Sequence, residues 1–328
     1  MQRRDFIKFF AGSAVAWPLA AGAQQPGRPV IGFLSSSSPD EYTIRLRAFR
    51  QGLKDAGFIE GQNVTVEYRW AEDQYNRLPA LAAELVRRQV NVIVAGGGTP
   101  SAIVAKAATA TIPIVFATAV DPVAIGLVAS LDRPGGNVTG VTNMNVEMGP
   151  KRLELLRELL PKATTIAVLT NPSSRALAER FLQDLRPAAH TLGMQLHVLN
   201  ASSKRDFDTV FAALAKVQAA ALLICPDVFF NAQIEQFAAL GIRHAVPVAY
   251  QYRPFVQAGG LLSYGSDETE YYRLVGIQAG KILKGEKPAD LPVIQSTKVE
   301  LFINLKTAKA LGITVPQSVQ SRADDVIE

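Results

Sequence analysis

Several prolines in this chain stand beside a small polar residue, close behind an apolar run. Such a pair is the usual start of a helix, because the polar side chain accepts from a free backbone N–H and the proline needs no partner. Helix starts also favour negatively charged groups, since the free N–H groups point toward them. The pairs therefore indicate either simple helix caps or a binding site for an anionic group. They are Ser38-Pro39 (with Glu41 completing a capping box), Thr99-Pro100, Asp121-Pro122, Asn171-Pro172 and Pro226-Asp227.

Three glycines precede Thr99-Pro100 and make this pair the strongest candidate for a binding site. Val90 to Ala95 is apolar and β-branched, as in a strand that is buried on both faces. Gly96, Gly97 and Gly98 can turn tightly and bring backbone close to a ligand. An alanine-rich helix then runs to about Ala110, and Pro113 to Ala119 is a second buried strand. Strand, capped helix and strand in succession indicate a parallel α/β sheet.

The same alternation continues along the chain and places the polar pairs where strands end, which is where ligands bind in open α/β sheets. In the first half, strands are predicted over 31–34, 64–70, 90–95, 113–119 and 138–141, and helices over about 40–56, 76–89, 99–110 and 123–130. In the second half, strands are predicted over 165–170, 195–199, 221–225, 246–249 and 261–264, and helices over 151–160, 175–192, 207–217 and 234–240.

The C-terminal part predicts that the chain passes repeatedly between two lobes. A long helix over 267–284 follows the last strand of the second half, and a strand over 299–303 and a short helix near 307–311 come after it. Roughly 300 residues also exceed what one hydrophobic core usually supports. We expect two doubly wound, Rossmann-like α/β lobes joined by a multi-crossing hinge. The first comprises 28–141 and about 266–290, and the second comprises 142–265 and about 291–328.

Residues 1–23 have the pattern of an export signal. Arg3-Arg4 precedes an apolar stretch from Phe9 to Ala21, and the small residues ending at Ala23 fit a signal-peptidase site. The paired arginines predict export through the twin-arginine route to the periplasm, with cleavage after Ala23. The apolar stretch is short for a membrane span, and an uncleaved anchor is the alternative.

Charge and rare residues weigh against several classes of function. Removal of residues 1–23 lowers the formal charge from +5 to +3, with acids and bases interspersed, which gives no case for nucleic acid. Cys225 lies in an apolar run and is predicted to be a small buried hydrophobe. His190, His197 and His244 lack metal-ligand spacing, so we expect no metal and no cofactor. An exported oxidoreductase is the enzyme alternative, but GGGTPS lacks the G-x-G-x-x-G spacing of dinucleotide sites.

Six segments carry a family resemblance over nearly the whole chain after the signal. They are GGTPSA at 97–102, FATAVDPVAIGLVASL at 116–131, RPGGNVTGV at 133–141, LLICPD at 222–227, YYRLVGIQAGKILKGEKPADLPV at 271–293 and NLKTAKALGITVP at 304–316. In their order and spacing the chain resembles type I periplasmic binding proteins of the ABC-transporter substrate-binding family that includes tryptophan and aromatic amino-acid uptake proteins. The resemblance implies two lobes that close on one small ligand, no catalysis, and delivery of the ligand to an inner-membrane ABC permease.

The resemblance also implies ligand contacts at strand ends that face the cleft. In the first lobe these are Ser36, Ser37, Thr99, Ser101, Thr118 and Asp121, and in the second lobe Asn171, Ser173, Ser174, Asp227, Tyr250 and Tyr264. The chain departs from the family pattern in two segments. Asn171 to Arg175 lacks the acidic residue that members with amino-acid ligands tend to carry, and Gly265 to Glu270 is longer.

The chemistry of these residues suits a small carboxylate-bearing ligand. Thr99, Ser101 and the amides of Gly97 and Gly98 form a donor-rich hollow for a carboxylate. Asp227 is either a helix cap or an acceptor for a ligand amine or hydroxyl. Tyr250, Tyr264 and Trp70 could stack on a planar ligand.

The ligand class that follows is an aromatic or other amino acid, or an aromatic or aliphatic carboxylate. We expect a monomer that serves a permease. The alternative within the same fold is a ligand-sensing periplasmic protein that docks on a receptor.

Overall fold

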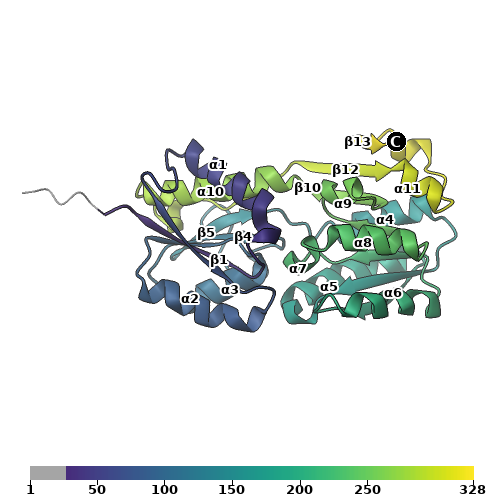
Figure 1. Ribbon diagram of the computed structural model, residues 1–328, viewed down its shortest axis with the longest axis horizontal. Coiled ribbons are helices and arrows are strands. Elements are labelled where there is room, and N and C mark those ends of the chain that lie inside the picture. Colours follow the sequence, from purple (N-terminus) through teal and green to yellow (C-terminus); the bar gives the residue numbers. More distant parts are fainter. Residues whose placement is uncertain (1–26) are drawn as a thin grey trace, which may run out of the picture.

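Two mostly parallel β-sheets with helices packed against them form the two lobes of the chain (Figure 1). The computed structural model describes residues 27–328, so the predicted export signal and its cleavage site lie outside the described residues. The predicted fold class, two α/β lobes of doubly wound type, is confirmed.

The first sheet has the strand order β11-β5-β4-β3-β1-β2, with parallel pairing throughout. Its strands are β1 (Val30–Ser35), β2 (Thr65–Trp70), β3 (Val92–Ala95), β4 (Ile114–Thr118), β5 (Val138–Thr142) and β11 (Ile294–Gln295). Its helices are η1 (Asp40–Tyr42), α1 (Thr43–Asp55), η2 (Tyr75–Arg77), α2 (Leu78–Arg87), α3 (Thr99–Ala108), α10 (Glu268–Leu283) and η4 (Pro288–Asp290).

The second sheet has the order β13-β12-β10-β9-β8-β6-β7, in which β10 and β12 are antiparallel and the other pairs are parallel. Its strands are β6 (Thr165–Thr170), β7 (Gln195–Asn200), β8 (Ala221–Ile224), β9 (Val248–Tyr250), β10 (Leu262–Ser266), β12 (Val299–Asn304) and β13 (Asp325–Ile327). Its helices are α4 (Gly149–Leu159), η3 (Pro172–Ser174), α5 (Arg175–Thr191), α6 (Asp206–Lys216), α7 (Val228–Asn231), α8 (Ile234–Arg243), α9 (Arg253–Gln257), α11 (Leu305–Ala310) and α12 (Gln317–Gln320).

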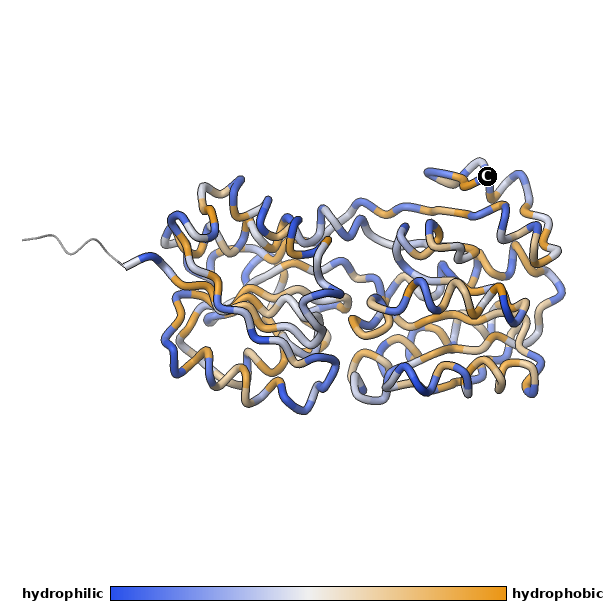
Figure 2. The backbone as a smooth tube through the Cα atoms, viewed as in Figure 1, coloured by the Kyte–Doolittle hydropathy of each residue, from blue (hydrophilic) through white to orange (hydrophobic). Residues whose placement is uncertain are grey.

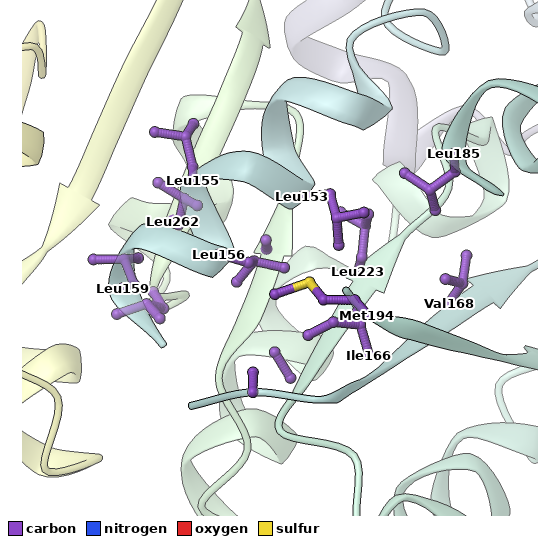
Figure 3. Packing of buried hydrophobic residues seen from close by; sticks show 14 of the residues in the cluster. Leu153, Leu155, Leu156, Leu159, Ile166, Val168, Leu185, Met194, Leu223 and Leu262 are labelled. Carbon is purple, nitrogen blue, oxygen red and sulfur yellow. The ribbon is translucent and has the colours of Figure 1, made fainter. Parts of the chain in front are cut away.

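Continuous apolar runs form the central strands, which are buried as such runs predict. In Figure 2 hydrophobic colour follows the strands and hydrophilic colour alternates along the outer helices. Figure 3 shows how the leucines of α4, such as Leu153 and Leu156, lie over Ile166 and Leu223, with Met194 beside them. Burial of this face, rather than helix propensity, holds α4 in place.

The predicted helix over 123–130 is wrong. The amides of Leu127 and Val128 both bond to the Pro122 carbonyl, at 2.8 and 3.3 Å, in a short series of turns. Gly126 has a φ of 69°, a left-handed conformation from which a right-handed helix cannot continue. The unpredicted elements α9, α12, β11 and β13 are too short to show a period in the sequence.

The chain passes between the two sheets at 143–148, at 267 and at 296–298 within the described residues. Because β11 pairs with β5, the first sheet takes in chain beyond the lobe boundary expected near residue 290. The fully buried Arg152 ties the first of these passages to strand β10: its guanidinium donates to the carbonyls of Tyr264 (2.7 Å) and Asn145 (2.8 Å). The Asn145 side chain in turn accepts from the Ser266 amide at 3.0 Å.

Helix α10 returns to the first lobe and packs directly on α1 (Figure 1). Glycines make this approach possible. A Cβ atom on Gly52 would lie 1.9 Å from the Arg273 carbonyl oxygen, and one on Gly276 would lie 2.2 Å from the Phe49 carbonyl oxygen.

Candidate functional site

A small cavity lies between the two lobes at the carboxyl ends of their parallel strands. The volume of this cavity is about 20 Å³, which is room for roughly one water molecule. Its lining comprises Gly98, Thr99, Pro100, Ala119, Asn143, Leu177, Pro226, Asp227, Val228, Asn231, Gln251, Tyr252, Tyr271 and Tyr272. Of the residues singled out from the sequence as ligand contacts, Gly98, Thr99 and Asp227 are in this lining.

The first lobe contributes the start of α3. Gly98 precedes this helix with a φ of 80°, and no side chain caps the helix, so its first N–H groups are free to face the cavity. A Cβ atom on Gly98 would lie 2.6 Å from the Val228 side chain of the other lobe, so only glycine allows the lobes to approach here. The hydroxyl of Thr99 lies 2.7 Å from that of Thr118.

Three more of the predicted residues, Ser36, Gly97 and Ser101, are packed around this helix start outside the cavity lining. Ser36 donates to the Gly97 carbonyl at 2.7 Å, and a Cβ atom on Gly97 would lie 2.2 Å from the Ser36 amide. The fully buried Ser101 hydroxyl has no hydrogen-bond partner among the described residues. The glycines are therefore needed for close packing of the loop, as well as for approach to the cavity.

The second lobe contributes Asp227, which is 4% exposed. Its Oδ1 accepts from the Phe229 amide at the start of α7 (3.0 Å) and from Asn171 (3.1 Å). It also accepts from the Tyr75 hydroxyl of the first lobe at 2.9 Å. Oδ2 is buried and has no partner in the part of the chain that the structure describes. Asp227 is therefore a helix cap through one oxygen and free to bind a ligand through the other.

Burial raises the pKa of Asp227, while its bonds from Asn171, Tyr75 and Phe229 act in the opposite direction. The buried Ser174 hydroxyl, which like Oδ2 has no partner at normal hydrogen-bond distance among the described residues, lies close enough to the carboxylate to lower the pKa of Asp227 as a hydrogen-bond donor. A buried carboxylate with these donors favours a cationic or hydrogen-bond-donating ligand.

Three tyrosines that the sequence reasoning missed as site residues form an aromatic side of the cavity. Tyr271 and Tyr272 lie in the first turn of α10, and their hydroxyls donate to the carbonyls of Thr118 (3.0 Å) and Gly96 (3.2 Å). Tyr252 follows β9 in the second lobe, and its hydroxyl accepts from Asn143 at 3.0 Å. Tyr271 and Tyr272 are both buried in the core cluster of the first lobe, as the helical spacing predicts, and nothing in that spacing showed that they also line a cavity.

Other predicted contact residues lie outside the cavity lining. Tyr250 is fully buried in the core of the second lobe, and its hydroxyl donates to Asn231 at 2.6 Å. Tyr264 packs partly buried against the cluster under α4. Trp70 stacks on Tyr68 in the first lobe, with their rings 5.8 Å apart.

The remaining predicted contacts are local. Ser37 donates to Glu41 at 2.9 Å, Asp121 accepts from the Val123 amide at 2.8 Å, and Ser173 is exposed. Each of the first two arranges the loop that follows its strand and does not reach the cavity lining. Neither bond caps a helix, because the segment after Asp121 forms turns and no described side chain caps η1, so the helix-cap interpretation of these two pairs is wrong.

A second set of contacts joins the lobes beside the cavity. Glu41 of the first lobe accepts from Lys204 (3.4 Å) and Gln233 (3.2 Å) of the second. Asp73 lies near them with a φ of 60°, and its Oδ1 is buried without a partner in residues 27–328. Burial, and then the negative charge of Glu41, raise the pKa of Asp73 to about 7.

Three further features of residues 27–328 concern metal ligands, the single cysteine and the apolar length of the helices. No group of histidine, cysteine and acidic side chains there has the arrangement of a metal site. Cys225 is buried, and burial raises the pKa of its thiol well above the ordinary value. No helix in the same range is long and apolar enough to cross a membrane.

Comparisons with known proteins bear on the family and on the two-lobed fold. The family model described as "ABC transporter substrate binding protein" matches residues 28–327. A "Tyrosine-binding protein" of Clostridioides difficile is 28% identical over 273 residues, which cover 81% of this chain and 76% of that protein.

Two solved structures bear on the conformation. A domain from Streptococcus pneumonia in complex with L-Trp has a TM-score of 0.79 and 26% identity, with 92% of this chain and 100% of that chain covered. The ligand-free, open structure of a substrate-binding protein from Clostridium difficile has a TM-score of 0.61 and 25% identity, with coverage of 92% and 99%. The TM-score is higher with the ligand-bound structure than with the open one, as expected if the two lobes of this chain are closed.

Proposed function

The chain belongs to the family of ABC transporter substrate-binding proteins, and from this premise we propose that it binds an aromatic amino acid between its lobes. The ligand then passes to an inner-membrane ABC permease. The tyrosine-binding relative and the structure with L-Trp support this ligand class, since both are named for aromatic amino acids. We further propose that the protein is exported to the periplasm and acts as a monomer.

The observation that carries the proposal is the pairing of the α3 start with Asp227 across one cavity. The free N–H groups of α3 and the Thr99 hydroxyl suit the ligand's carboxylate. The unpartnered Oδ2 of Asp227 suits its ammonium group. These two charges lie close together in every α-amino acid.

The alternative ligand, a carboxylate without an amine, fits less well. It would leave Oδ2 of Asp227 unpaired, which costs about 1–3 kcal/mol in a buried site. Tyr252, Tyr271 and Tyr272 favour an aromatic over an aliphatic side chain, because rings in contact gain energy beyond their buried area.

The size of the cavity implies that binding is coupled to movement. Space for roughly one water molecule is far too small for an amino acid, so the lobes must part or the lining must rearrange to admit one. The passages of the chain between the sheets are the natural hinge, since few segments there need to change conformation.

A thermal-shift screen of residues 24–328 against all amino acids and a set of aromatic and aliphatic carboxylates tests the proposal. Ligand at about 100 times its dissociation constant adds roughly 2.7 kcal/mol of stability. We expect aromatic amino acids to raise the melting temperature and Asp227→Asn to remove most of that rise. A rise caused only by carboxylates without an amine would refute the amino-acid assignment.

A further inference from the structure

Tyr75 of the first lobe follows a loop with an unusual backbone conformation. It opens η2, directly after a loop in which Glu72 and Asp73 both have positive φ, at 53° and 60°. Such conformations are costly for residues other than glycine and persist only where surrounding structure enforces them. Three backbone hydrogen bonds to the segment after β1 hold the loop in place. The Ala71 amide donates to the Ser35 carbonyl (2.9 Å), the Glu72 amide to the Ser37 carbonyl (3.2 Å), and the Asp73 amide to the Ser36 carbonyl (2.7 Å).

This loop positions the Tyr75 side chain so that it contacts the second lobe. The partly buried ring packs against apolar clusters of both lobes. Its hydroxyl donates to Oδ1 of Asp227 at 2.9 Å. Burial, and then the charge of Asp227, raise the pKa of Tyr75 well above its ordinary value, so the hydroxyl keeps its proton and remains a donor.

Among the described donors to Oδ1 of Asp227, Tyr75 alone comes from the first lobe. Asn171 and the Phe229 amide belong to the same lobe as Asp227 and stay with it when the lobes part. The full set of donors therefore exists only in the closed arrangement. A carboxylate that accepts more hydrogen bonds is better held in its charged form, and burial opposes that form.

We propose that Tyr75 is a positioning residue that couples closure of the lobes to recognition of the ligand's amine, by completing the donor set of Asp227 only when the lobes close. This inference rests on the proposed function. Tyr75 holds Oδ1 and favours the charged form of Asp227 against the effect of burial, which leaves Oδ2 as the acceptor for the ligand's amine. The other titratable groups near Asp227 are Asp73 from the first lobe and Cys225 and Tyr250 from the second.

The variant Tyr75→Phe keeps the ring and removes only the donor. Tyr68→Phe is a matched control in the same lobe, because the Tyr68 hydroxyl bonds to Glu60 and Arg50 on the surface and is absent from the cavity lining. Two measurements distinguish positioning of Asp227 by Tyr75 from a purely structural role of Tyr75. The first is the titration of the Asp227 carboxylate by ¹³C NMR in protein saturated with L-tryptophan, in which the lobes are closed, assigned with Asp227→Asn. The second is calorimetric affinity for L-tryptophan and for 3-indolepropanoate, which lacks the amine.

We expect Tyr75→Phe to move the Asp227 titration to higher pH and to weaken L-tryptophan binding about 10- to 100-fold, as loss of a hydrogen bond to a charged group does. Binding of 3-indolepropanoate should weaken less. An Asp227 titration equal to that of the wild type and Tyr68→Phe would overturn the inference. Failure of the wild type to bind any aromatic amino acid would instead refute the proposed function, whereas binding by the wild type with an unchanged titration in Tyr75→Phe would refute only the role of Tyr75.

Discussion

The hydroxyl groups of Thr99 and Thr118 lie 2.7 Å apart where α3 begins and β4 ends. Thr99 is in the cavity lining and 2% exposed, whereas Thr118 stands behind it and is fully buried. The pair holds the Thr99 side chain in one orientation at the helix start. With Thr118 as the donor of this bond, the Thr99 hydroxyl keeps its proton for a ligand carboxylate, and its position is set before binding, which lowers the entropy cost of the contact.

Thr99→Ala should weaken binding of an aromatic amino acid by roughly 1–3 kcal/mol through loss of this donor. Asp121→Ala should leave affinity unchanged, because Asp121 bonds to the Val123 amide outside the cavity lining. Isothermal titration calorimetry measures both. Equal losses in the two variants would show that the helix start of α3 is not the carboxylate site.

Affinity should fall as pH rises from 6 to 8. The pKa of Asp73 is raised to about 7, above its ordinary range, by burial and then by Glu41, with Asp227 adding to the rise and Lys204 and Arg45 opposing it. A group with a raised pKa in the closed form stabilises that form below the pKa of the open form, and this stabilisation is lost as pH rises through about 7. The ligand affinity should fall by up to about tenfold between pH 6 and pH 8.

Asp73→Asn is the control for this pH dependence, because it removes the titrating group and keeps its size. Its affinity should be nearly constant between pH 6 and 8 in the same calorimetric series. A wild type and an Asp73→Asn variant with the same pH profile would rule out proton uptake at Asp73 on closure.

Gly52→Ala should destabilise the first lobe. The new Cβ atom would lie 1.9 Å from the Arg273 carbonyl, so α1 and α10 would have to separate. Overpacking of this kind costs about 1–3 kcal/mol, which outweighs the roughly 1 kcal/mol that alanine gains over glycine within a helix. Urea unfolding of residues 24–328 measures the loss. Gly27→Ala, which meets no atom within 4 Å, should unfold like the wild type.

The contact between Lys204 and Glu41 should contribute little. The Lys204 side chain is 58% exposed, so solvent and salt screen the pair. Lys204→Met should change ligand affinity by less than about fivefold. This small effect should disappear in 0.5 M NaCl, and a large effect that persists in salt would mean that the pair holds the lobes closed.

Much of the fold follows from local signals in the sequence. Buried strands such as β3 and β8 are continuous apolar runs, and the polar residue beside a proline near the start of the next helix marks where each strand ends. The segment 123–130 has apolar spacing like a helix, but the sequence does not reveal that Gly126 takes a left-handed conformation there. Local pattern cannot report that choice, because glycine is compatible with both outcomes.

The site was predictable only in part. Gly98, Thr99 and Asp227 could be identified because each lies beside a helix start with its own local signature. Tyr252 was missed although it is only two residues from Tyr250, because the direction of a side chain just after a strand depends on the turn. Tyr75 contacts Asp227 from 152 residues away, and no local pattern records such a pairing.

The most direct test of the account is the affinity of residues 24–328 for L-tryptophan or L-tyrosine, compared by calorimetry with that for the same molecule without its amine. We expect the amino acid to bind more tightly, by about 1–3 kcal/mol, because its ammonium pairs with the free oxygen of Asp227. That difference should vanish in Asp227→Asn. Equal binding of the two molecules, or binding of neither, would contradict the proposed amino-acid site.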